Sequence, residues 1–435
     1  MKIRTLNREN ISALLELMQK RKPSSFPKQE KAVAEILDAV RKDGDKALFA
    51  YTRQFDHAEL DAGSVLVSEE EIREAYDAVG EEFLRVLRAA AARIRAFHEK
   101  QKEKSWFETE KNGSLLGQRV IPLQKVGLYA PGGTAAYPSS VLMNVLPAQI
   151  AGVPEIILCT PCGPDGKAAA PTVVAAHEAG VGKIFKIGGA QAIAAMAFGT
   201  ESVPKVDKIT GPGNIYVALA KKAVYGYVSI DSVAGPSEIL VLADETANPR
   251  YVAADLLSQA EHDVLASAVC VTTSMELAEK IAEEAEAFIP QLARKEIIRQ
   301  SVDNYGVILV AENMDEAIAA VNEIASEHLE ILTADPFAVM PKILHAGAIF
   351  LGEYASEPLG DYFAGPNHVL PTCGTARFFS ALSVQDFVKK SSVIYFTEDA
   401  LRSLHKDIET FAKAEGLTAH AGSIAVRFEK EEGRK

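Results

Sequence analysis

The 435-residue sequence lacks the features of a secreted, membrane-spanning or nucleic-acid-binding protein. Its four cysteines are too few and too scattered to form a disulfide framework. No apolar run reaches the length of a membrane span, and residues 1–8 contain no apolar signal core. Basic residues are not in excess, because the net charge is -13. This negative charge disfavours nucleic acid or an anionic membrane surface as the main partner. We therefore expect a soluble, cytoplasmic protein.

Length and periodicity indicate an α/β protein of several domains. A chain of 435 residues is too long for one compact core. The first hundred residues are helical in pattern, and Ser68 and Glu71 form a capping box before a helix expected to reach Lys100. From residue 119 short β-branched runs alternate with helical segments, which predicts two doubly wound parallel sheets in tandem. We expect strands near 125–130, 155–160, 183–187, 206–210, 238–243, 266–272, 306–311 and 347–351.

Three glycine-rich turns follow predicted strands of the first sheet, at residues 129–133, 187–191 and 210–214. In an open parallel sheet such turns gather at the carboxyl edge, where backbone N–H groups and helix N-termini favour a phosphate. Tight turns that need a glycine backbone give the same pattern, and Gly211-Pro-Gly213 lacks the third glycine of the dinucleotide fingerprint. The turns indicate a nucleotide-type ligand without establishing it.

The cysteines do not indicate a redox or zinc site. Cys159-Thr-Pro-Cys162 follows a strand and has no second cysteine pair to complete a zinc ribbon. We interpret this pair as incidental, and Cys270 as part of an apolar strand in the core. Cys373 has no evident activator in the sequence, so we do not expect a cysteine acyl intermediate.

Residues able to do chemistry concentrate in the last two-fifths of the chain. Gln259 and His262 project from one face of a predicted helix, as metal ligands can, although such a pair is also typical of a solvated helix end. Glu327-His328 is expected to end a helix that begins near Met314. The imidazole suits a general base and a desolvated Glu can activate water, while a solvated helix C-terminus is the alternative.

Two further segments place a carboxylate near an imidazole. Asp361 and His368 lie in a glycine- and proline-rich loop at 356–371, a composition common in functional loops. Glu415 and His420 follow a predicted C-terminal helix.

Taken in order, these motifs resemble those of the histidinol dehydrogenase family. The resemblance covers nearly the whole chain and rests on Ile230 to Glu238, Gln259-Ala-Glu-His262, Ser326-Glu327-His328, Gly360 to His368 and Leu417-Thr-Ala-His420. It implies a cytoplasmic homodimer that completes histidine biosynthesis. The enzyme would use zinc and two NAD to oxidise L-histidinol through the aldehyde to L-histidine.

The resemblance also implies roles for individual residues. Glu327 and His328 match the acid–base pair. The implied zinc ligands are Gln259, His262, Asp361 and a His420 lent by the partner subunit. The implied NAD contacts are Tyr129, Gln191 and Asn214. The implied substrate contacts are Ser237, His368 and Glu415, together with Gln259, His262, Glu327, His328, Asp361 and His420.

A discontinuous domain organisation is implied as well. Residues 1–25 would pack with the tail, and residues 26–124 with 238–378 would form the first Rossmann-like domain. Residues 125–237 would form the second, NAD-binding one, and residues 379–435 a tail domain that reaches the partner subunit.

Three other functions stay open at this point. A zinc dehydrogenase of the same family could oxidise another polar alcohol, since Glu415 and His368 set substrate choice more than reaction type. A zinc hydrolase would use the metal to activate water and form no NADH. A non-catalytic nucleotide-binding protein would not need the crowd of ionisable groups between residues 327 and 420.

Overall fold

The computed structural model describes residues 1–21, 25–132 and 136–429, so Gly133 of the first glycine-rich turn lies outside the described residues. The chain divides into two compact units. The main unit consists of Met1–Lys102 and Leu123–Phe387, and the small unit of Glu103–Pro122 and Val388–Lys435. No helix among the described residues has the length and apolar character to cross a membrane.

Four helices form much of the first hundred residues. The longest begins with the predicted capping box: the Ser68 hydroxyl accepts the N–H of Glu71 at 3.2 Å, and the Glu71 carboxylate accepts the N–H of Ser68 at 2.7 Å. It ends at His98, two residues before the expected end. The helices are α1 (Arg8–Gln19), α2 (Pro27–Asp43), α3 (Asp45–Asp56) and α4 (Glu69–His98).

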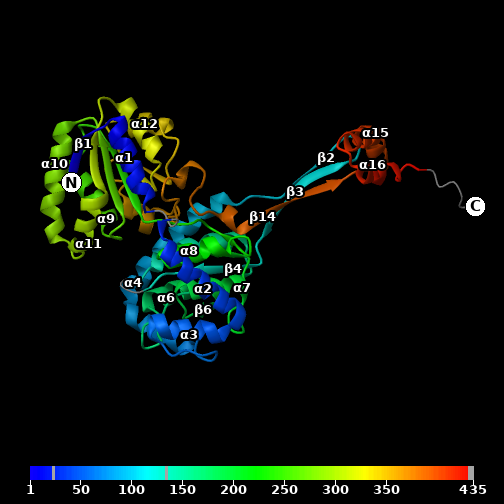
Figure 1. Ribbon diagram of the computed structural model, residues 1–435, viewed down its shortest axis with the longest axis horizontal. Helices are drawn as coiled ribbons and strands as arrows, with labels where there is room; N and C mark the ends of the chain where they lie inside the picture. Colours follow the sequence, from blue (N-terminus) through cyan, green and yellow to red (C-terminus); the bar gives the residue numbers. More distant parts are fainter. Residues whose placement is uncertain (22–24, 133–135, 430–435) are drawn as a thin grey trace, which may run out of the picture. The chain divides into compact units, whose positions relative to one another are not determined.

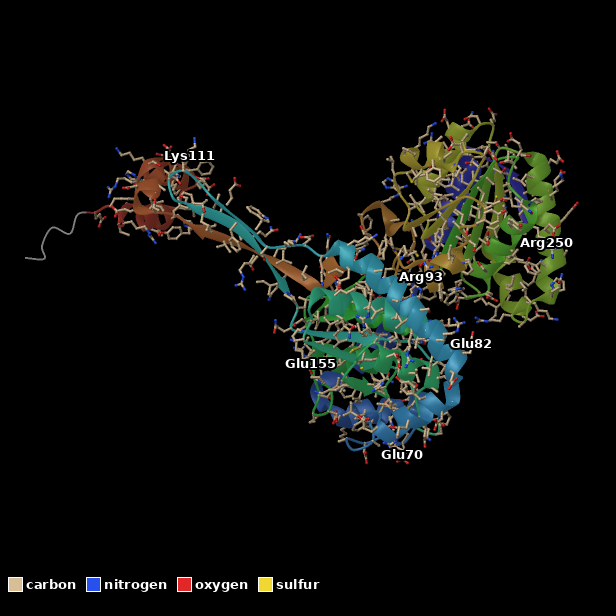
Figure 2. All side chains as sticks on the ribbon, turned by 180° about the vertical axis from the view of Figure 1, so that it is seen from behind. Glu70, Glu82, Arg93, Lys111, Glu155 and Arg250 are labelled. Carbon is tan, nitrogen blue, oxygen red and sulfur yellow. The ribbon has the colours of Figure 1, made fainter. Side chains whose placement is uncertain are left out.

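A five-stranded parallel sheet follows, in the order β6-β5-β4-β7-β8. Two of its strands, β4 and β6, are labelled in Figure 1. This is the strand order of a Rossmann half, in which the first and fourth strands are neighbours. Glu155, which is labelled in Figure 2, starts β5 and forms an ion pair of 2.9 Å with Lys125, which starts the adjacent β4. Alternate strand residues enter opposite cores: Ile157 packs with α2, α7 and α8, and Leu158 packs with α4, α5 and α6. The elements are β4 (Lys125–Tyr129), α5 (Pro138–Ala151), β5 (Glu155–Cys159), α6 (Ala170–Glu178), β6 (Lys183–Phe185), α7 (Gly189–Phe198), β7 (Lys208–Thr210), α8 (Ile215–Val224) and β8 (Ser229–Ile230).

The second sheet is six-stranded and parallel, in the order β1-β11-β10-β9-β12-β13. Its last five strands repeat the Rossmann order, and the chain's first strand adds an edge by pairing Lys2 with Val307. The predicted class of two doubly wound parallel sheets is therefore confirmed. The elements are β1 (Lys2–Thr5), β9 (Glu238–Ala243), α9 (Pro249–Ala260), β10 (Ser267–Thr272), α10 (Met275–Phe288), α11 (Lys295–Tyr305), β11 (Gly306–Val310), α12 (Met314–Ile324), β12 (His328–Leu332), α13 (Pro336–Val339), β13 (Ala348–Leu351) and α14 (Glu357–Leu359).

Two sequence-based expectations about elements were wrong. The N-terminus is not purely helical, because residues 2–5 form a strand. The helix from Met314 does not reach Glu327-His328: it ends at Ile324, and a fully buried strand begins at His328. A strand buried on both faces loses the alternation that identifies strands, so a five-residue one is easily read as the end of a helix.

The small unit is an antiparallel three-stranded sheet with two helices. Few of its side chains are buried, and large apolar ones such as Trp106, Ile394 and Phe411 are more than half exposed. The expected packing of residues 1–25 with this part of the chain stays a prediction. The elements are β2 (Trp106–Thr109), β3 (Leu115–Pro122), β14 (Val388–Tyr395), α15 (Glu398–Ala414) and α16 (Thr418–Ala425).

Removing the cap of α4 should weaken the fold measurably. We expect Ser68→Ala to lower the free energy of unfolding by about 1 kcal/mol, because the N–H of Glu71 loses its acceptor. Urea unfolding followed by circular dichroism measures this change. Ser68→Thr keeps a hydroxyl acceptor and serves as the control. Equal stability of Ser68→Ala and the unaltered protein would contradict the prediction.

Candidate active site

The candidate site lies where β9 and β12 begin. These strands are neighbours in the second sheet, with His328 opposite Ile239, so the segments that lead into them lie side by side. Glu327 and His328 are both buried, at 6% and 3% exposure. The alternative of a solvated helix end is thus wrong for this pair, which stands at the amino end of a central strand.

The main chain of Glu238 orients both groups. Its N–H donates to the Glu327 carboxylate at 2.8 Å, and its carbonyl oxygen lies 3.0 Å from Nδ1 of His328. A carbonyl can only accept, so Nδ1 carries the proton of this bond. In the neutral ring Nε2 is then the proton-accepting atom, and it lies 3.7 Å from a carboxylate oxygen of Asp361.

Burial and mutual charge shift the pKa of each group in this cluster. Burial raises the pKa of Glu327 to about 8. Burial opposes a charged His328 ring, but the charges of Glu327 and Asp361 outweigh it and raise the pKa of His328 to about 10. Burial alone would raise the pKa of Asp361, yet His368 and His328 lower it to about 2. Asp361 is therefore an anion near neutral pH.

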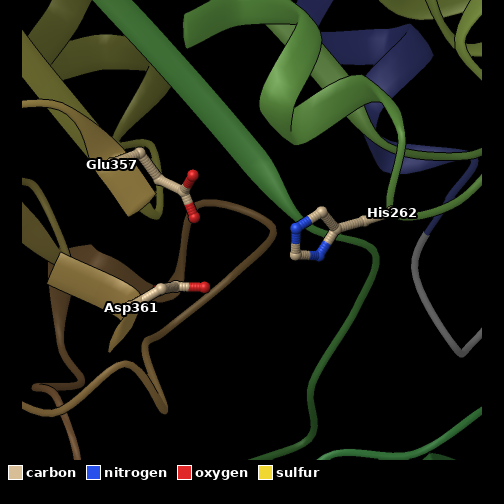
Figure 3. Close-up of side chains that lie close together, drawn as sticks. All are labelled: His262, Glu357 and Asp361. Atoms are coloured by element: carbon tan, nitrogen blue, oxygen red, sulfur yellow. The ribbon is translucent and has the colours of Figure 1, made fainter. Parts of the chain in front are cut away.

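Beside this pair, His262, Glu357 and Asp361 offer ligand atoms that all lie within 4.8 Å of one another. Figure 3 shows the two carboxylates directed toward the His262 ring. His262 lies just after α9 rather than on it, which differs from the expected single helix face shared with Gln259. Desolvation by the surrounding protein lowers the pKa of His262. A lower pKa favours the neutral ring, whose unprotonated nitrogen can coordinate a metal.

The residues present fit a divalent cation. Gln259 is buried at 1% exposure, and neither polar atom of its side-chain amide has a hydrogen-bond partner among the described residues. Burying an amide without partners is costly, so a bound group that uses its oxygen would relieve the cost. Imidazole, carboxylate and amide donors together form an N/O set that suits zinc.

Glu357 is a candidate that the sequence analysis missed. Its N–H donates to the Glu330 carboxylate at 2.7 Å, and its own carboxylate accepts the hydroxyl of Ser258 at 3.2 Å. Burial raises the pKa of Glu357 to about 8. The four-residue spacing of Glu357 and Asp361 was the available signal, because it is the spacing of neighbours on one helix face. The intervening Pro358 and Gly360 hid it.

The loop of His368 connects the site to the first sheet. Nδ1 of His368 donates to the backbone oxygen of Asp361 at 3.1 Å, and Nε2 lies 3.2 Å from the hydroxyl of Ser140 on α5. Since Nδ1 holds the ring proton, Nε2 accepts from Ser140. Ser237 is half-buried just before β9. Substrate binding by Ser237 and His368 stays a prediction.

The glycine-rich turns of the first sheet lie at its carboxyl edge, where β4 and β7 mark the switch in strand order. Tyr129 joins two of the turns, since its buried hydroxyl accepts the N–H of Gly189 at 3.0 Å. Asn214 caps α8 by accepting the N–H groups of Tyr216 and Val217. Both residues thus have structural contacts, and their binding of NAD stays a prediction.

At this edge Gln191 offers a buried amide, and Gly211 forms a tight turn. Both polar atoms of the buried Gln191 amide lack a hydrogen-bond partner among the described residues, as expected where a ligand is to bind. Gly211 has a φ of +123°, and a Cβ there would lie 2.0 Å from the backbone oxygen of Tyr129. Asp231 accepts its N–H at 2.8 Å and Lys221 donates to its carbonyl at 2.8 Å, so the turn is held firmly.

The remaining predicted residues lie elsewhere. Glu415 and His420 are exposed in the small unit, at the end of α15 and within α16. Their roles as substrate contact and metal ligand stay predictions. Burial raises the pKa of Cys162 to about 11 and that of Cys270 to about 12, which disfavours the thiolate form that reacts.

Comparisons with known proteins point to one family. The family model for histidinol dehydrogenase matches residues 19–428. The chain is 59% identical to a histidinol dehydrogenase of Caldanaerobacter subterraneus, with 92% of each chain covered. It is 57% identical to one of Geobacillus kaustophilus, with 94% of this chain and 96% of that one covered. The crystal structure of histidinol dehydrogenase from Elizabethkingia anophelis matches with a TM-score of 0.92 at 36% identity, covering 100% of this chain and 99% of that one.

The raised pKa of Glu357 predicts how its side chain affects stability. Because the pKa is higher in the folded than in the unfolded chain, the folded form holds an extra proton between about pH 4.5 and 8, and stability falls as pH rises through that range. We expect Glu357→Gln to flatten this fall. Melting temperatures at pH 6 and pH 8.5, with chelator present, measure it. The exposed Glu353→Gln is the control, and an unchanged slope in Glu357→Gln would refute the prediction.

Proposed function

The chain belongs to the histidinol dehydrogenase family, an NAD-dependent oxidoreductase family that performs the last step of histidine biosynthesis, and we propose the following use of its residues. His328 and Glu327 would be the acid–base pair for oxidation of L-histidinol to L-histidine. The observation that carries this proposal is the contact of Glu238 with both groups, which leaves Nε2 of His328 as the accepting atom.

His328 takes the alcohol proton in the first oxidation. Bound NAD supplies the hydride acceptor, so the alcohol carbon loses a hydride and the oxygen loses a proton to Nε2. The charges of nearby carboxylates, Asp361 among them, raise the pKa of His328. A cation bound by Asp361 would offset its charge and lower the pKa of His328, which favours the unprotonated ring that a base requires. Tyr129, Gln191 and Asn214 are the proposed NAD contacts.

Glu327 serves the second oxidation. Its carboxylate removes a proton from water as the water adds to the aldehyde, and protonated His328 returns its proton to the carbonyl oxygen, which gives a gem-diol and an unprotonated His328. The gem-diol then loses a hydride to a second NAD and a proton to His328, and the acid forms. Burial gives Glu327 a pKa of about 8, close to the working pH of an acid–base group.

We propose zinc as the metal and Gln259, His262, Asp361 and a His420 from a second subunit as its ligands, with Glu357 added by the geometry. When bound, the ion supplies a fixed anchor for the imidazole and amine nitrogens of histidinol. The chain's own groups then act on an alcohol carbon held in one place. Ser237, His368 and Glu415 are the proposed substrate contacts beside them.

A homodimer would account for the small unit. Trp106, Ile394 and Phe411 expose more apolar surface than a small monomeric unit usually does, and a second copy would cover it. Glu415 and His420 belong to that unit, so dimer formation would bring them to a site. The domain limits and the cytoplasmic location stay proposals from the sequence.

An assay of NADH formation tests the function. We expect two NADH per L-histidinol, loss of the activity with a chelator, and recovery with zinc. Other amino alcohols and diols serve as comparison substrates. Faster oxidation of another alcohol would correct the substrate, and the absence of NADH with every alcohol would refute the function.

Variants of the acid–base pair test the assigned roles. Removing a general base typically lowers the rate by about 10²- to 10⁴-fold. We expect His328→Asn to lose this much with both alcohol and aldehyde, and Glu327→Gln to lose it chiefly with the aldehyde. Glu353→Gln, an exposed acid, is the control. Small, equal losses in both variants would contradict the roles.

A further inference from the structure

A buried ion pair lies behind the acid–base pair and has no part in the chemistry above. Arg21 follows α1, and Glu238 is the first residue of β9. Their side chains are 0% exposed, and Nη2 of Arg21 lies 2.5 Å from Oε1 of Glu238. Burying two charges costs several kcal/mol per ion, and well-packed apolar side chains in place of a buried ion pair often give equal or greater stability. The pair therefore calls for a role besides stability.

Glu238 joins three groups through its side chain and its main chain. Its carboxylate binds Arg21. Its own N–H and carbonyl hold Glu327 and His328. The backbone atoms that orient the acid–base pair thus belong to a residue whose carboxylate is anchored by Arg21.

Arg21 is in turn anchored to a different part of the sheet. Its Nη1 donates to the backbone oxygen of Leu265 at 2.7 Å, just before β10. Its guanidinium lies over the ring of Tyr305, at the end of α11, 5.3 Å from the centroid. The planar guanidinium can make both hydrogen bonds at once, which a lysine ammonium in the same place cannot do with the same geometry.

We propose that Arg21 and Glu238 are positioning residues: their ion pair fixes the backbone of residue 238 and thereby the ring of His328 and the carboxylate of Glu327. The inference rests on the proposed roles of those two groups. A shift of residue 238 misplaces the acid–base pair and the adjacent Ser237, a proposed substrate contact, but does not involve the proposed NAD contacts Tyr129, Gln191 and Asn214. The pair should therefore affect turnover of histidinol more than binding of NAD.

Glu238→Gln tests the proposal, since it keeps the shape and removes the charge. We expect kcat with histidinol to fall at least tenfold, by about the amount that a misplaced catalytic group costs, while KM for NAD stays within about twofold. Alcohol and aldehyde oxidation should fall together, unlike the expected effect of Glu327→Gln. Arg21→Lys keeps a cation opposite Glu238 and should retain more of kcat than Arg21→Gln.

A control and a second variant keep the test decisive. Asp386→Asn removes the partner of Lys208, another buried cation, at 3.2 Å and at the start of β7. It should lower the melting temperature but leave kcat unchanged. If Glu238→Gln does not fold, the double variant Arg21→Gln/Glu238→Gln, which buries no unpaired charge, is measured in its place.

The outcomes separate the inference from the function. A folded Glu238→Gln, or the double variant, with unchanged kcat and KM overturns the inference. An equal loss of kcat in Asp386→Asn also overturns it, because the effect is then one of general stability. NADH formation by the unaltered protein distinguishes these results from failure of the proposed function, in which that protein itself would form no NADH from histidinol.

Discussion

The backbone of Glu238 is the contact on which the site depends. One peptide N–H and one carbonyl, at the start of a central strand, hold a carboxylate and an imidazole that are adjacent in sequence but must act separately. Because β9 and β12 are paired along their length, the two strand starts cannot move independently. The sheet therefore sets the geometry of the acid–base pair. A loop would not hold it as firmly.

A cluster of buried carboxyl groups is the second constraint. Asp255, Glu330, Glu357 and Asp361 stand close together, and burial raises the pKa of the first three. Burial and mutual repulsion thus disfavour the charged forms of these three carboxyl groups. A divalent cation held by His262, Glu357 and Asp361, as proposed, would favour the charged forms.

The two sheets share a strand order, but their candidate functional residues lie at opposite ends of the strands. In the first, the glycine-rich turns follow the strands at the carboxyl edge, where open α/β sheets usually bind ligands. In the second, Glu238 and His328 begin their strands, so the proposed acid–base pair lies at the amino edge. The loop of His368, which contacts Ser140 on α5, connects this amino edge with the first sheet.

The sequence by itself determined the two parallel sheets, eight of the fourteen strands among the described residues, the capping box at Ser68 and the family, because these follow from local periodicity, turn residues and motifs in order. It did not determine β12, which is buried on both faces and so lacks alternation. Nor did it show Glu357 beside His262, or Arg21 in contact with Glu238, 217 residues away. Only the tertiary structure decided these, because burial and contact between distant segments leave no local pattern in the chain.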